Sequence, residues 1–333
     1  MMSETIDISV VVPAYNAADT IQRAINSVMD QTYPARETIV VDDGSRDETV
    51  EVVRAYGSAV RIVCQKNAGV AAARNRGISE SNCAWVAFLD ADDWWMPHRL
   101  EAGVSILNGR PWLRWAAGAY TVLLPDGISG EEPASSAYRA LLTDSCYFPD
   151  FYKAAAANIP FHTCTMLIRK DLIVDAGFFD SSLRTSEDRD LWYRIADQHP
   201  AIGFVDRPIF VYDRRREGSL TRGVIASHSQ DLWVLLQKHV PPVDSPNPLT
   251  SKAIFFRGEV NRAVRHAIRL GERENVARLA ATYREWFTVS SVVLALALRL
   301  TPKSVWLRLA KLWRWLYDPV RERHRRHDAQ PGR

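Results

Sequence analysis

The sequence has few cysteines and no cluster of metal-binding residues built on them. Its four cysteines, Cys64, Cys83, Cys146 and Cys164, are widely spaced and form no Cys-x-x-Cys pair, and its eight histidines show no ligand-type spacing such as His-x-x-x-His. This pattern argues against a disulfide scaffold and against a zinc site, and it fits a protein of a reducing cytosol.

Long apolar runs and targeting segments are also missing. The longest strongly apolar stretch without a charge, Trp286 to Leu298, has 13 residues, whereas a membrane-spanning helix needs about 20. The first seven residues contain no basic start followed by an apolar core, so no signal peptide is predicted. We therefore expect a cytoplasmic protein without a membrane span.

The net charge is small but unevenly distributed. Residues 299–333 hold ten Lys or Arg and three acids, a balance of +7, so a total of +3 leaves 3 − 7 = −4 for the remaining 298 residues. An acidic body with a basic tail gives the main domain no surface suited to nucleic acid, and we predict no nucleic-acid partner.

Short apolar strands alternate with helical patterns over the first hundred residues. Alternation of this kind is typical of a doubly wound, mostly parallel α/β sheet flanked by helices, and 333 residues leave room for a further region. The predicted strands are 8–12, 37–41, 60–64 and 85–89, and the predicted helices are 17–31, 47–56 and a segment ending near Ile78.

Polar residues follow each of these four strands. The last strand ends in Asp90-Ala-Asp92-Asp93, and three carboxylates so close together repel one another unless a cation lies among them. Ligands of open α/β sheets bind at the carboxyl ends of the strands. A polar loop that caps the following helix is the alternative for this cluster. No Gly-x-Gly-x-x-Gly follows the first strand, which counts against a dinucleotide site.

Five motifs in order resemble those of family 2 glycosyltransferases, which are inverting enzymes of the GT-A fold that use nucleotide-sugar donors. The first four lie within residues 11–16, 41–45, 67–77 and 88–93, and the fifth combines Gly177-Phe-Phe-Asp180 with the acidic segment Ser186 to Arg194. The resemblance covers about residues 6 to 222. It implies a GT-A-type domain and a role in cell-surface polysaccharide or glycoconjugate synthesis.

The resemblance implies a role for each matched residue. Asp188 is expected to be the catalytic base, with Glu187 beside it, and Asp90, Asp92 and Asp93 are expected to hold Mn²⁺ or Mg²⁺. Asp42 is expected to contact the base of the nucleotide and Asp43 to lie near its ribose. The expected nucleotide-sugar site comprises Pro13, Tyr15, Asn16, Asp42, Asp43, Lys66, Asn67, Gly69, Arg74, Asn75, Asp90 and Arg216.

The chemistry of sugar transfer requires groups of these kinds. A divalent ion neutralises the departing diphosphate, and a carboxylate that takes the acceptor's proton adds about 10²–10⁴ in rate. Purely structural alternatives remain: an Asp-Gly turn for Asp42 and Asp43, a solvated surface side chain for Lys66, and a helix cap for the acids 187–190. Relatives often have histidine where Arg216 stands, which suggests guanidinium contacts to the diphosphate instead. Residues 112–165 are expected to shape the acceptor site.

A proline-rich segment separates the main domain from a helical region. We expect a catalytic domain over residues 1–240, a linker over 241–250 and a helical region over 251–333, with helices at 252–270, 272–287 and 306–317. The last helix carries tryptophans on one face and basic residues on the other, as do helices that lie on anionic membranes. Packing against its own domain is the alternative. The tail favours a peripheral location on the inner face of the cell membrane.

Together these patterns predict a metal-dependent, inverting glycosyltransferase of the hexosyltransferase type (EC 2.4). The donor is expected to be a nucleotide sugar, most simply a UDP-sugar, and the acceptor a hydroxyl of a glycan, a lipid-linked sugar or another compound. The alternative is a non-catalytic nucleotide-sugar-binding protein on the same fold. A sugar nucleotidyltransferase would need a glycine-rich loop after the first strand, where Pro13-Ala-Tyr-Asn16 stands.

Overall fold

The chain forms two compact units, Met1–Val224 and Ile225–Arg333, which are described separately. The computed structural model describes residues 5–124, 127, 129–133, 136–215, 225–240, 250–270, 272–283 and 286, and of residues 225–231, 268–270 and 273 it describes the backbone alone. The predicted linker therefore lies outside the described residues except for Thr250, and the predicted helix at 306–317 lies outside them entirely.

The first unit is built on an eight-stranded sheet of order β3-β2-β1-β4-β10-β6-β11-β9. Strands β3, β2, β1 and β4 are parallel neighbours, β10 runs antiparallel between β4 and β6, and β11 is parallel to β6. Only β10 and the edge strand β9 run against the other six. The strands are β1 (Ile8–Ala14), β2 (Glu37–Asp42), β3 (Arg61–Cys64), β4 (Trp85–Phe88), β6 (Trp115–Gly118), β9 (Tyr147–Phe148), β10 (Leu167–Arg169) and β11 (Ile202–Val205).

A smaller, four-stranded sheet of order β5-β12-β7-β8 holds the other described strands of this unit. Its strands are β5 (Trp94–Trp95), β7 (Tyr120–Leu123), β8 (Ser129–Glu132) and β12 (Phe210–Asp213). Because β5 begins directly after Asp93, the second sheet starts where the acidic turn ends.

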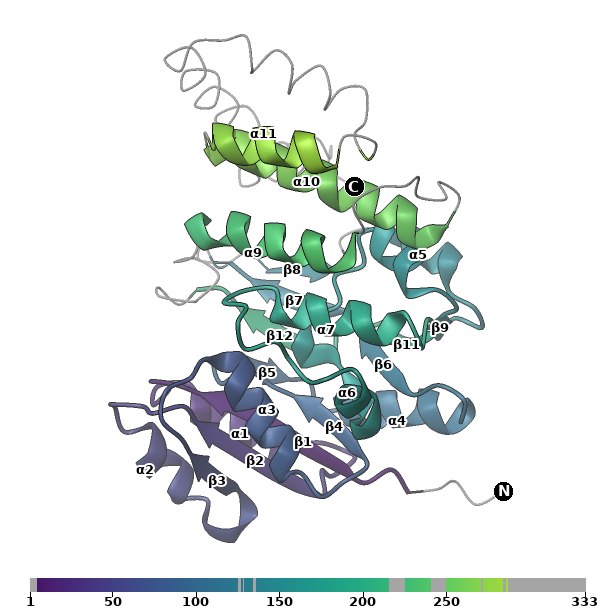
Figure 1. Cartoon of the computed structure of the whole chain (residues 1–333). Helices are drawn as coiled ribbons and strands as arrows, with labels where there is room; N and C mark the ends of the chain where they lie inside the picture. Colours follow the sequence, from purple (N-terminus) through teal and green to yellow (C-terminus); the bar gives the residue numbers. More distant parts are fainter. Residues whose placement is uncertain are drawn as a thin grey trace. The chain divides into compact units, whose positions relative to one another are not determined.

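Helices cover both faces of the large sheet (Figure 1). The described helices of the first unit are α1 (Ile21–Met29), α2 (Thr49–Arg54), α3 (Val70–Glu80), α4 (Arg99–Gly109), α5 (Phe151–Ala156), α6 (Lys170–Asp175) and α7 (Glu187–Ala196), with short 3₁₀ turns η1 (Gly57–Ala59), η2 (Ser136–Leu141) and η3 (Thr163–Thr165).

Strand β1 shows how the sequence places helices on opposite faces. Its Val10 and Val12 lie in one buried cluster with Ile21 and Ile25 of α1. Successive strand residues point to opposite faces, so the intervening Val11 faces α3. There a Cβ added to Gly77 would lie only 2.3 Å from a methyl carbon of Val11, so glycine is what lets this helix approach the strand.

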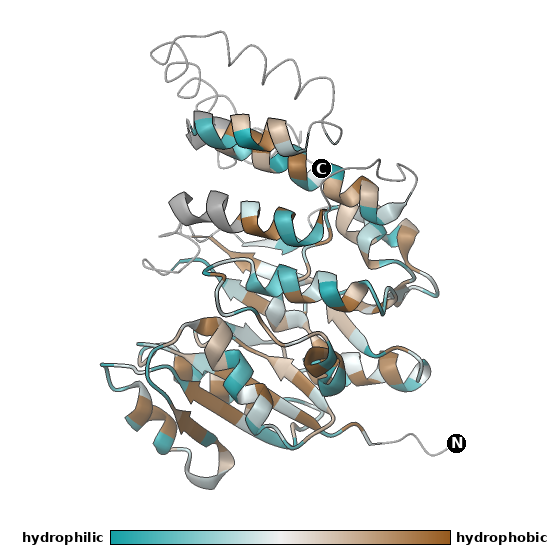
Figure 2. Ribbon diagram, viewed as in Figure 1, coloured by the Kyte–Doolittle hydropathy of each residue, from teal (hydrophilic) through white to brown (hydrophobic). Residues whose placement is uncertain are grey.

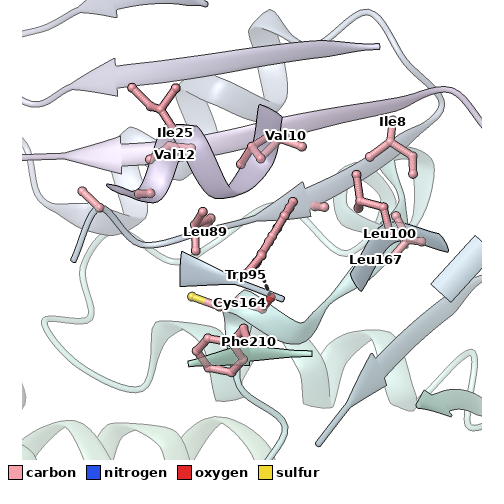
Figure 3. Packing of buried hydrophobic residues seen from close by; sticks show 14 of the residues in the cluster. Ile8, Val10, Val12, Ile25, Leu89, Trp95, Leu100, Cys164, Leu167 and Phe210 are labelled. Carbon is pink, nitrogen blue, oxygen red and sulfur yellow. Dashed lines mark hydrogen bonds between the residues drawn. The ribbon is translucent and has the colours of Figure 1, made fainter. Parts of the chain in front are cut away.

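The main core joins the parallel strands to the residues around the acidic turn. Figure 3 shows Ile8 near Leu100 and Leu167 at one end of the cluster. The Trp95 indole N–H donates to the Cys164 carbonyl at 3.2 Å. Figure 2 shows the central strands as mainly hydrophobic and helix α7 as largely hydrophilic. Burial on this scale fixes the strand ends from which the polar residues extend.

The second unit is helical in its described part, with α9 (Ile225–His239), α10 (Ser251–Leu270) and α11 (Arg273–Thr282). The two helices expected at 252–270 and 272–287 correspond to α10 and α11. Contacts group α9 with them, although the sequence suggested a domain boundary after residue 240. Among the described helices, none is both long enough and apolar enough to cross a membrane.

The fold class expected from the sequence is confirmed: a GT-A-type α/β domain with a large, mostly parallel sheet flanked by helices, and a helical region after it.

Candidate active site

The acidic turn after β4 places its three aspartates in different surroundings. Asp90 is partly exposed, and its backbone N–H donates to the Cys164 sulfur at 3.3 Å. Asp92 is half-buried, and its carbonyl accepts a hydrogen bond of 2.5 Å from Arg23. Asp93 is fully buried and accepts a hydrogen bond from the backbone N–H of Asp213 at 2.9 Å.

Burial and the two neighbouring aspartates raise the pKa of Asp93 well above its usual range. The Cys164 thiol also donates to Asp93, at 3.6 Å. Both oxygens of this carboxylate thus have protein partners, so Asp93 holds the turn to β12 and to the segment around Cys164.

Arg74 joins the acidic turn to the start of α7. Its guanidinium is buried and lies 2.7 Å from an Asp90 oxygen and 2.6 Å from a Glu187 oxygen. Burial by itself would raise the pKa of Asp90, but the Arg74 charge lowers it below its usual value. The two carboxylates raise the pKa of Arg74 in turn, so this buried cation stays charged.

The three acids at the start of α7 differ in what they contact. Burial, followed by repulsion from Asp188, raises the pKa of Glu187 to about 7 despite the contact with Arg74. Asp190 is fully buried and pairs with Arg194 at 2.6 Å. Asp188 is half-buried, accepts the hydroxyl of Thr163 at 3.2 Å and caps the backbone N–H of Arg189 at 2.7 Å.

A third segment, residues 162–165, lies between the acidic turn and α7. One ring nitrogen of His162 and one oxygen each of Asp90 and Asp93 all lie within 4.8 Å of one another. The Thr163 hydroxyl donates a hydrogen bond to Asp188, and the Cys164 thiol donates one to Asp93 of the acidic turn. Burial lowers the pKa of His162 although Asp90 and Asp188 oppose this effect.

Sequence reasoning singled out none of His162, Thr163 and Cys164, although they lie within residues 112–165, the region expected to shape the acceptor site. They precede β10, which runs antiparallel to β4 with Leu167 opposite Ala87. The beginning of an antiparallel strand lies at the edge where its parallel neighbours end. A search of the sequence for polar residues that follow strands could not find residues 162–164, because they precede a strand. The pattern that could have indicated them is a cluster of polar residues directly before a short apolar strand.

On the donor side, Asp42 and Asp43 are buried and hydrogen-bonded within the protein. Asp42 accepts the backbone N–H groups of Gly44 and Ser45 at 3.2 and 3.3 Å, as in an Asp-Gly turn. Asp43 accepts N–H groups from Ala68 at 2.9 Å and Gly69 at 2.8 Å, and so fixes the loop that leads into α3.

The other expected donor-site residues lie around the same edge. Pro13 is buried in β1, and Tyr15 is 48% exposed just beyond the strand. The side chain of Asn16 accepts the backbone N–H of Arg46 at 2.8 Å. Arg216 lies outside the described residues, whereas Lys66, Asn67 and Gly69 are exposed on the loop before α3.

Asn75 is the exception, since its side chain points to the segment before α7. Its amide exchanges two hydrogen bonds with the backbone of Phe179, at 2.8 and 3.0 Å. Arg74 therefore connects α3 to the start of α7, whereas Asn75 connects α3 to Phe179 in the segment before α7.

The oxygen-rich group around Asp90 suits a hard divalent ion. Carboxylate oxygens are the ligands that Mg²⁺ and Mn²⁺ prefer, and Asp90 combines partial exposure with a lowered pKa. Asp92 lies beside it, half-buried. Asp93 is less suited to contact an ion because it is fully buried and hydrogen-bonded.

Comparison with known proteins gives related glycosyltransferases. The family model described as "Glycosyl transferase family 2" matches residues 9–111. An uncharacterized glycosyltransferase of Rickettsia prowazekii is 28% identical over 233 residues, which cover 68% of this chain and 70% of the relative. Glycosyltransferase AglE of Haloferax volcanii is 31% identical over 223 residues, which cover 65% of this chain and 69% of the relative.

Solved structures share the fold at low sequence identity. S. aureus TarS 1–349 in complex with UDP-GlcNAc is 15% identical, with a TM-score of 0.56 over 85% of this chain and 93% of that one. The mannosyltransferase PcManGT from Pyrobaculum calidifontis, in complex with GDP-Man and Mn²⁺, is 19% identical, with a TM-score of 0.53 over 93% of this chain and 87% of that one.

The family match, the arrangement of the sheet and the similarity to AglE, which covers 65% of this chain and 69% of AglE, all indicate the same family. The chain belongs to glycosyl transferase family 2.

Proposed function

We propose that this glycosyltransferase moves a sugar from a nucleoside-diphosphate donor to an acceptor hydroxyl, with inversion at the transferred carbon. The observation that carries the proposal is the double ion pair of Arg74, which ties the acid after β4 to the acid at the start of α7. A diphosphate-side group and a base-side group are thereby held at one site, as direct displacement requires.

Asp188 is the base in this proposal. It is the acid of α7 that is neither buried nor paired with an arginine, whereas Glu187 pairs with Arg74 and Asp190 with Arg194. The Thr163 hydroxyl fixes one of its oxygens. Taking the acceptor's proton at the remaining face would raise the nucleophilicity of the acceptor oxygen as the bond to the sugar forms.

For the metal, we propose Mn²⁺ or Mg²⁺ held by Asp90 and Asp92, with Asp93 supporting the turn. When bound, such an ion would neutralise the negative charge that develops on the departing diphosphate. Support comes from the partial exposure and lowered pKa of Asp90, from the half-buried position of Asp92 beside it, and from the Mn²⁺ in the PcManGT complex.

The donor is proposed to be a UDP-sugar carrying a hexose, since the TarS complex contains UDP-GlcNAc; GDP-mannose, as in the PcManGT complex, is the second donor to test. For the acceptor we propose a hydroxyl of a glycan or a lipid-linked sugar in cell-surface polysaccharide or glycoconjugate synthesis. A cytoplasmic location with peripheral contact to anionic membrane fits the basic tail.

The test begins with a thermal-shift screen of UDP- and GDP-sugars with Mn²⁺, because a ligand that binds the folded state alone raises the melting temperature. Asp188→Asn should then leave donor affinity nearly unchanged and lower turnover, or slow donor hydrolysis, by about 10²–10⁴. Asp175→Asn, the same change at an exposed position on α6, is the matched control.

Wild-type turnover in Asp188→Asn would assign this residue to helix capping and move the test to Glu187. A protein that binds a nucleotide sugar but neither transfers nor hydrolyses it would favour the non-catalytic alternative. Full activity in EDTA would remove the metal from the proposal.

A further inference from the structure

His162 has a ring held on several sides by aromatic residues of the small sheet. Its centroid lies 4.8 Å from that of Phe210, 4.9 Å from that of Tyr212 and 5.5 Å from that of Tyr120. A ring packed in this way keeps one orientation, so each of its two nitrogens has a fixed position and a separate role.

The first task is structural. The Nδ1 atom accepts the backbone N–H of Cys164 at 3.2 Å, at the start of the turn η3. A nitrogen that accepts an N–H has no proton of its own, so the proton of the neutral ring is on Nε2. His162 is only partly buried, and within the described part of the chain its Nε2 makes no hydrogen bond.

The second task follows from where the ring lies. On one side are Asp90 and Asp93, within 4.8 Å of a ring nitrogen, and on the other Thr163 connects the same turn to Asp188. If Asp90 lies on the diphosphate side and Asp188 on the acceptor side, the group between them is the sugar being transferred.

We propose that His162 is a specificity-determining residue that donates its Nε2–H to a ring oxygen or hydroxyl oxygen of the transferred sugar. This inference rests on the proposed function. A neutral imidazole N–H at a partly buried site discriminates between sugars, because a sugar without the matching oxygen leaves that donor unpaired.

The same proton argues against His162 as a metal ligand. To bind an ion, Nε2 would have to lose its proton while Nδ1 gained one, and the hydrogen bond from Cys164 would then be lost. Two further hydrogen bonds hold this segment: Trp95 donates to the carbonyl of Cys164, and Arg99 donates to the carbonyl of Met166, the residue after η3. The turn is thus fixed without a metal.

Two substitutions separate the two nitrogens. In His162→Asn the amide oxygen replaces Nδ1 and can still accept the Cys164 N–H, but no donor reaches the position of Nε2. In His162→Gln the longer amide keeps a donor near Nε2 and loses the acceptor at Nδ1. His199→Asn, at a histidine beyond the end of α7, is the matched control.

The measurement is calorimetry on the full chain with Mn²⁺, with two probes for each variant. One probe is the nucleotide sugar among UDP-GlcNAc, UDP-glucose, UDP-galactose and GDP-mannose that stabilises wild type most, and the other is its nucleoside diphosphate without sugar. We expect His162→Asn to weaken the binding of the nucleotide sugar by about tenfold and to leave the affinity for the nucleoside diphosphate unchanged. His162→Gln should reduce the affinity for the nucleotide sugar less than His162→Asn does.

Equal weakening of both probes would place His162 on the diphosphate or metal and overturn the inference, as would an unchanged affinity for both. If wild type binds the nucleotide sugar and only the effect of His162→Asn is missing, the inference fails and the proposed function stands. If wild type binds none of the nucleotides or nucleotide sugars, both fail.

A spectroscopic measurement covers the case in which the asparagine variant does not fold. In ¹⁵N-histidine-labelled wild type, the Nε2 signal of His162, assigned by its loss in His162→Gln, should shift when the nucleoside diphosphate is replaced by the nucleotide sugar. An unmoved signal would overturn the inference.

Discussion

Arg74 is the side chain on which the arrangement of the acids most depends. Asp90, Glu187 and Asp188 bring three carboxylates close together, and the cation that lies among them in the described part of the chain is this one guanidinium. Its planar fork meets two carboxylates at once, which the point charge of a lysine cannot do. Removing one partner of a buried ion pair leaves the others uncompensated.

Arg74→Met should therefore lower the free energy of unfolding by about 3 kcal/mol or more. Arg74→Lys should cost less, because a cation remains, yet it should lower turnover since Asp90 and Glu187 are no longer held by one group. Urea unfolding followed by tryptophan fluorescence measures the first effect. Arg76→Met, two residues along the same helix at an exposed pair with Glu80, is the control and should change stability by less than about 1 kcal/mol.

If Arg74→Met and Arg76→Met had the same free energy of unfolding, the buried cation would not be required for the stability of the site. It would also remove the double ion pair as the support for the proposed function.

At the residue level, sequence patterns identified where the acids lie but not what each contacts. The expected roles of Asp42 and Asp43 in nucleotide binding stay predictions, and both side chains already accept hydrogen bonds from nearby backbone. Burial separates Asp93 from Asp90, three residues away. Contacts of this kind depend on which loops meet in space, and a motif does not contain that information.

At the level of elements, Glu37 connects the start of β2 to two other parts of the sheet. Its carboxylate accepts the Ser9 hydroxyl of β1 and the backbone N–H of Asn82, both at 2.6 Å. Burial alone would raise the pKa of Glu37, but these hydrogen bonds lower it below the usual value. The turn before β4 is thereby fixed to the strand two places away in the sheet.

Glu37→Gln should lower the free energy of unfolding at pH 7 by about 1 kcal/mol. A carboxylate whose pKa is lower in the folded state stabilises the fold above its unfolded pKa of about 4.3, and this contribution is lost as the pH falls through the folded value. The stability difference between wild type and variant should therefore shrink below about pH 4. Urea unfolding from pH 3 to pH 7 measures it.

Glu51→Gln, an exposed position in the first turn of α2, is the control and should show no comparable pH-dependent difference. If the difference in unfolding free energy between wild type and Glu37→Gln stayed constant down to pH 3, the ionised carboxylate of Glu37 would not be the source of the stabilisation.

Elements of the first hundred residues were predictable because local patterns and global fold agree there. The alternation of strands and helices, and the small residues of α3, have direct counterparts in β1, β4 and the packing of Gly77 on Val11. Beyond residue 112 the sequence offered no such regularity. Strand β10 has three residues and runs antiparallel, so neither its length nor its position in the sheet could be inferred.

For the whole molecule, charge separates the body from the tail. Residues 299–333 carry +7 and the rest −4, and the tail, like the predicted amphipathic helix at 306–317, lies outside the described residues. Membrane contact is accordingly a prediction from charge and sequence pattern. It matters for function because a lipid-linked acceptor is reached at a membrane surface.

We expect the full chain to co-sediment with vesicles of phosphatidylcholine and phosphatidylserine at low salt. Replacing Arg321, Arg323, Arg325 and Arg326 by Gln should weaken this binding by at least about tenfold, because each basic residue near an anionic surface contributes about 1 kcal/mol. Raising the salt to about 0.15 M shortens the screening length to about 8 Å and should weaken wild-type binding too.

The matched control replaces four exposed arginines of the body by Gln: Arg36, Arg54, Arg76 and Arg207. If this control weakens binding as much as the tail variant, net charge rather than the tail is responsible. If wild type does not co-sediment even at low salt, the amphipathic segment has another partner, and its own domain is the first to test. This second result would redirect the search for the acceptor from lipid-linked sugars to soluble glycans.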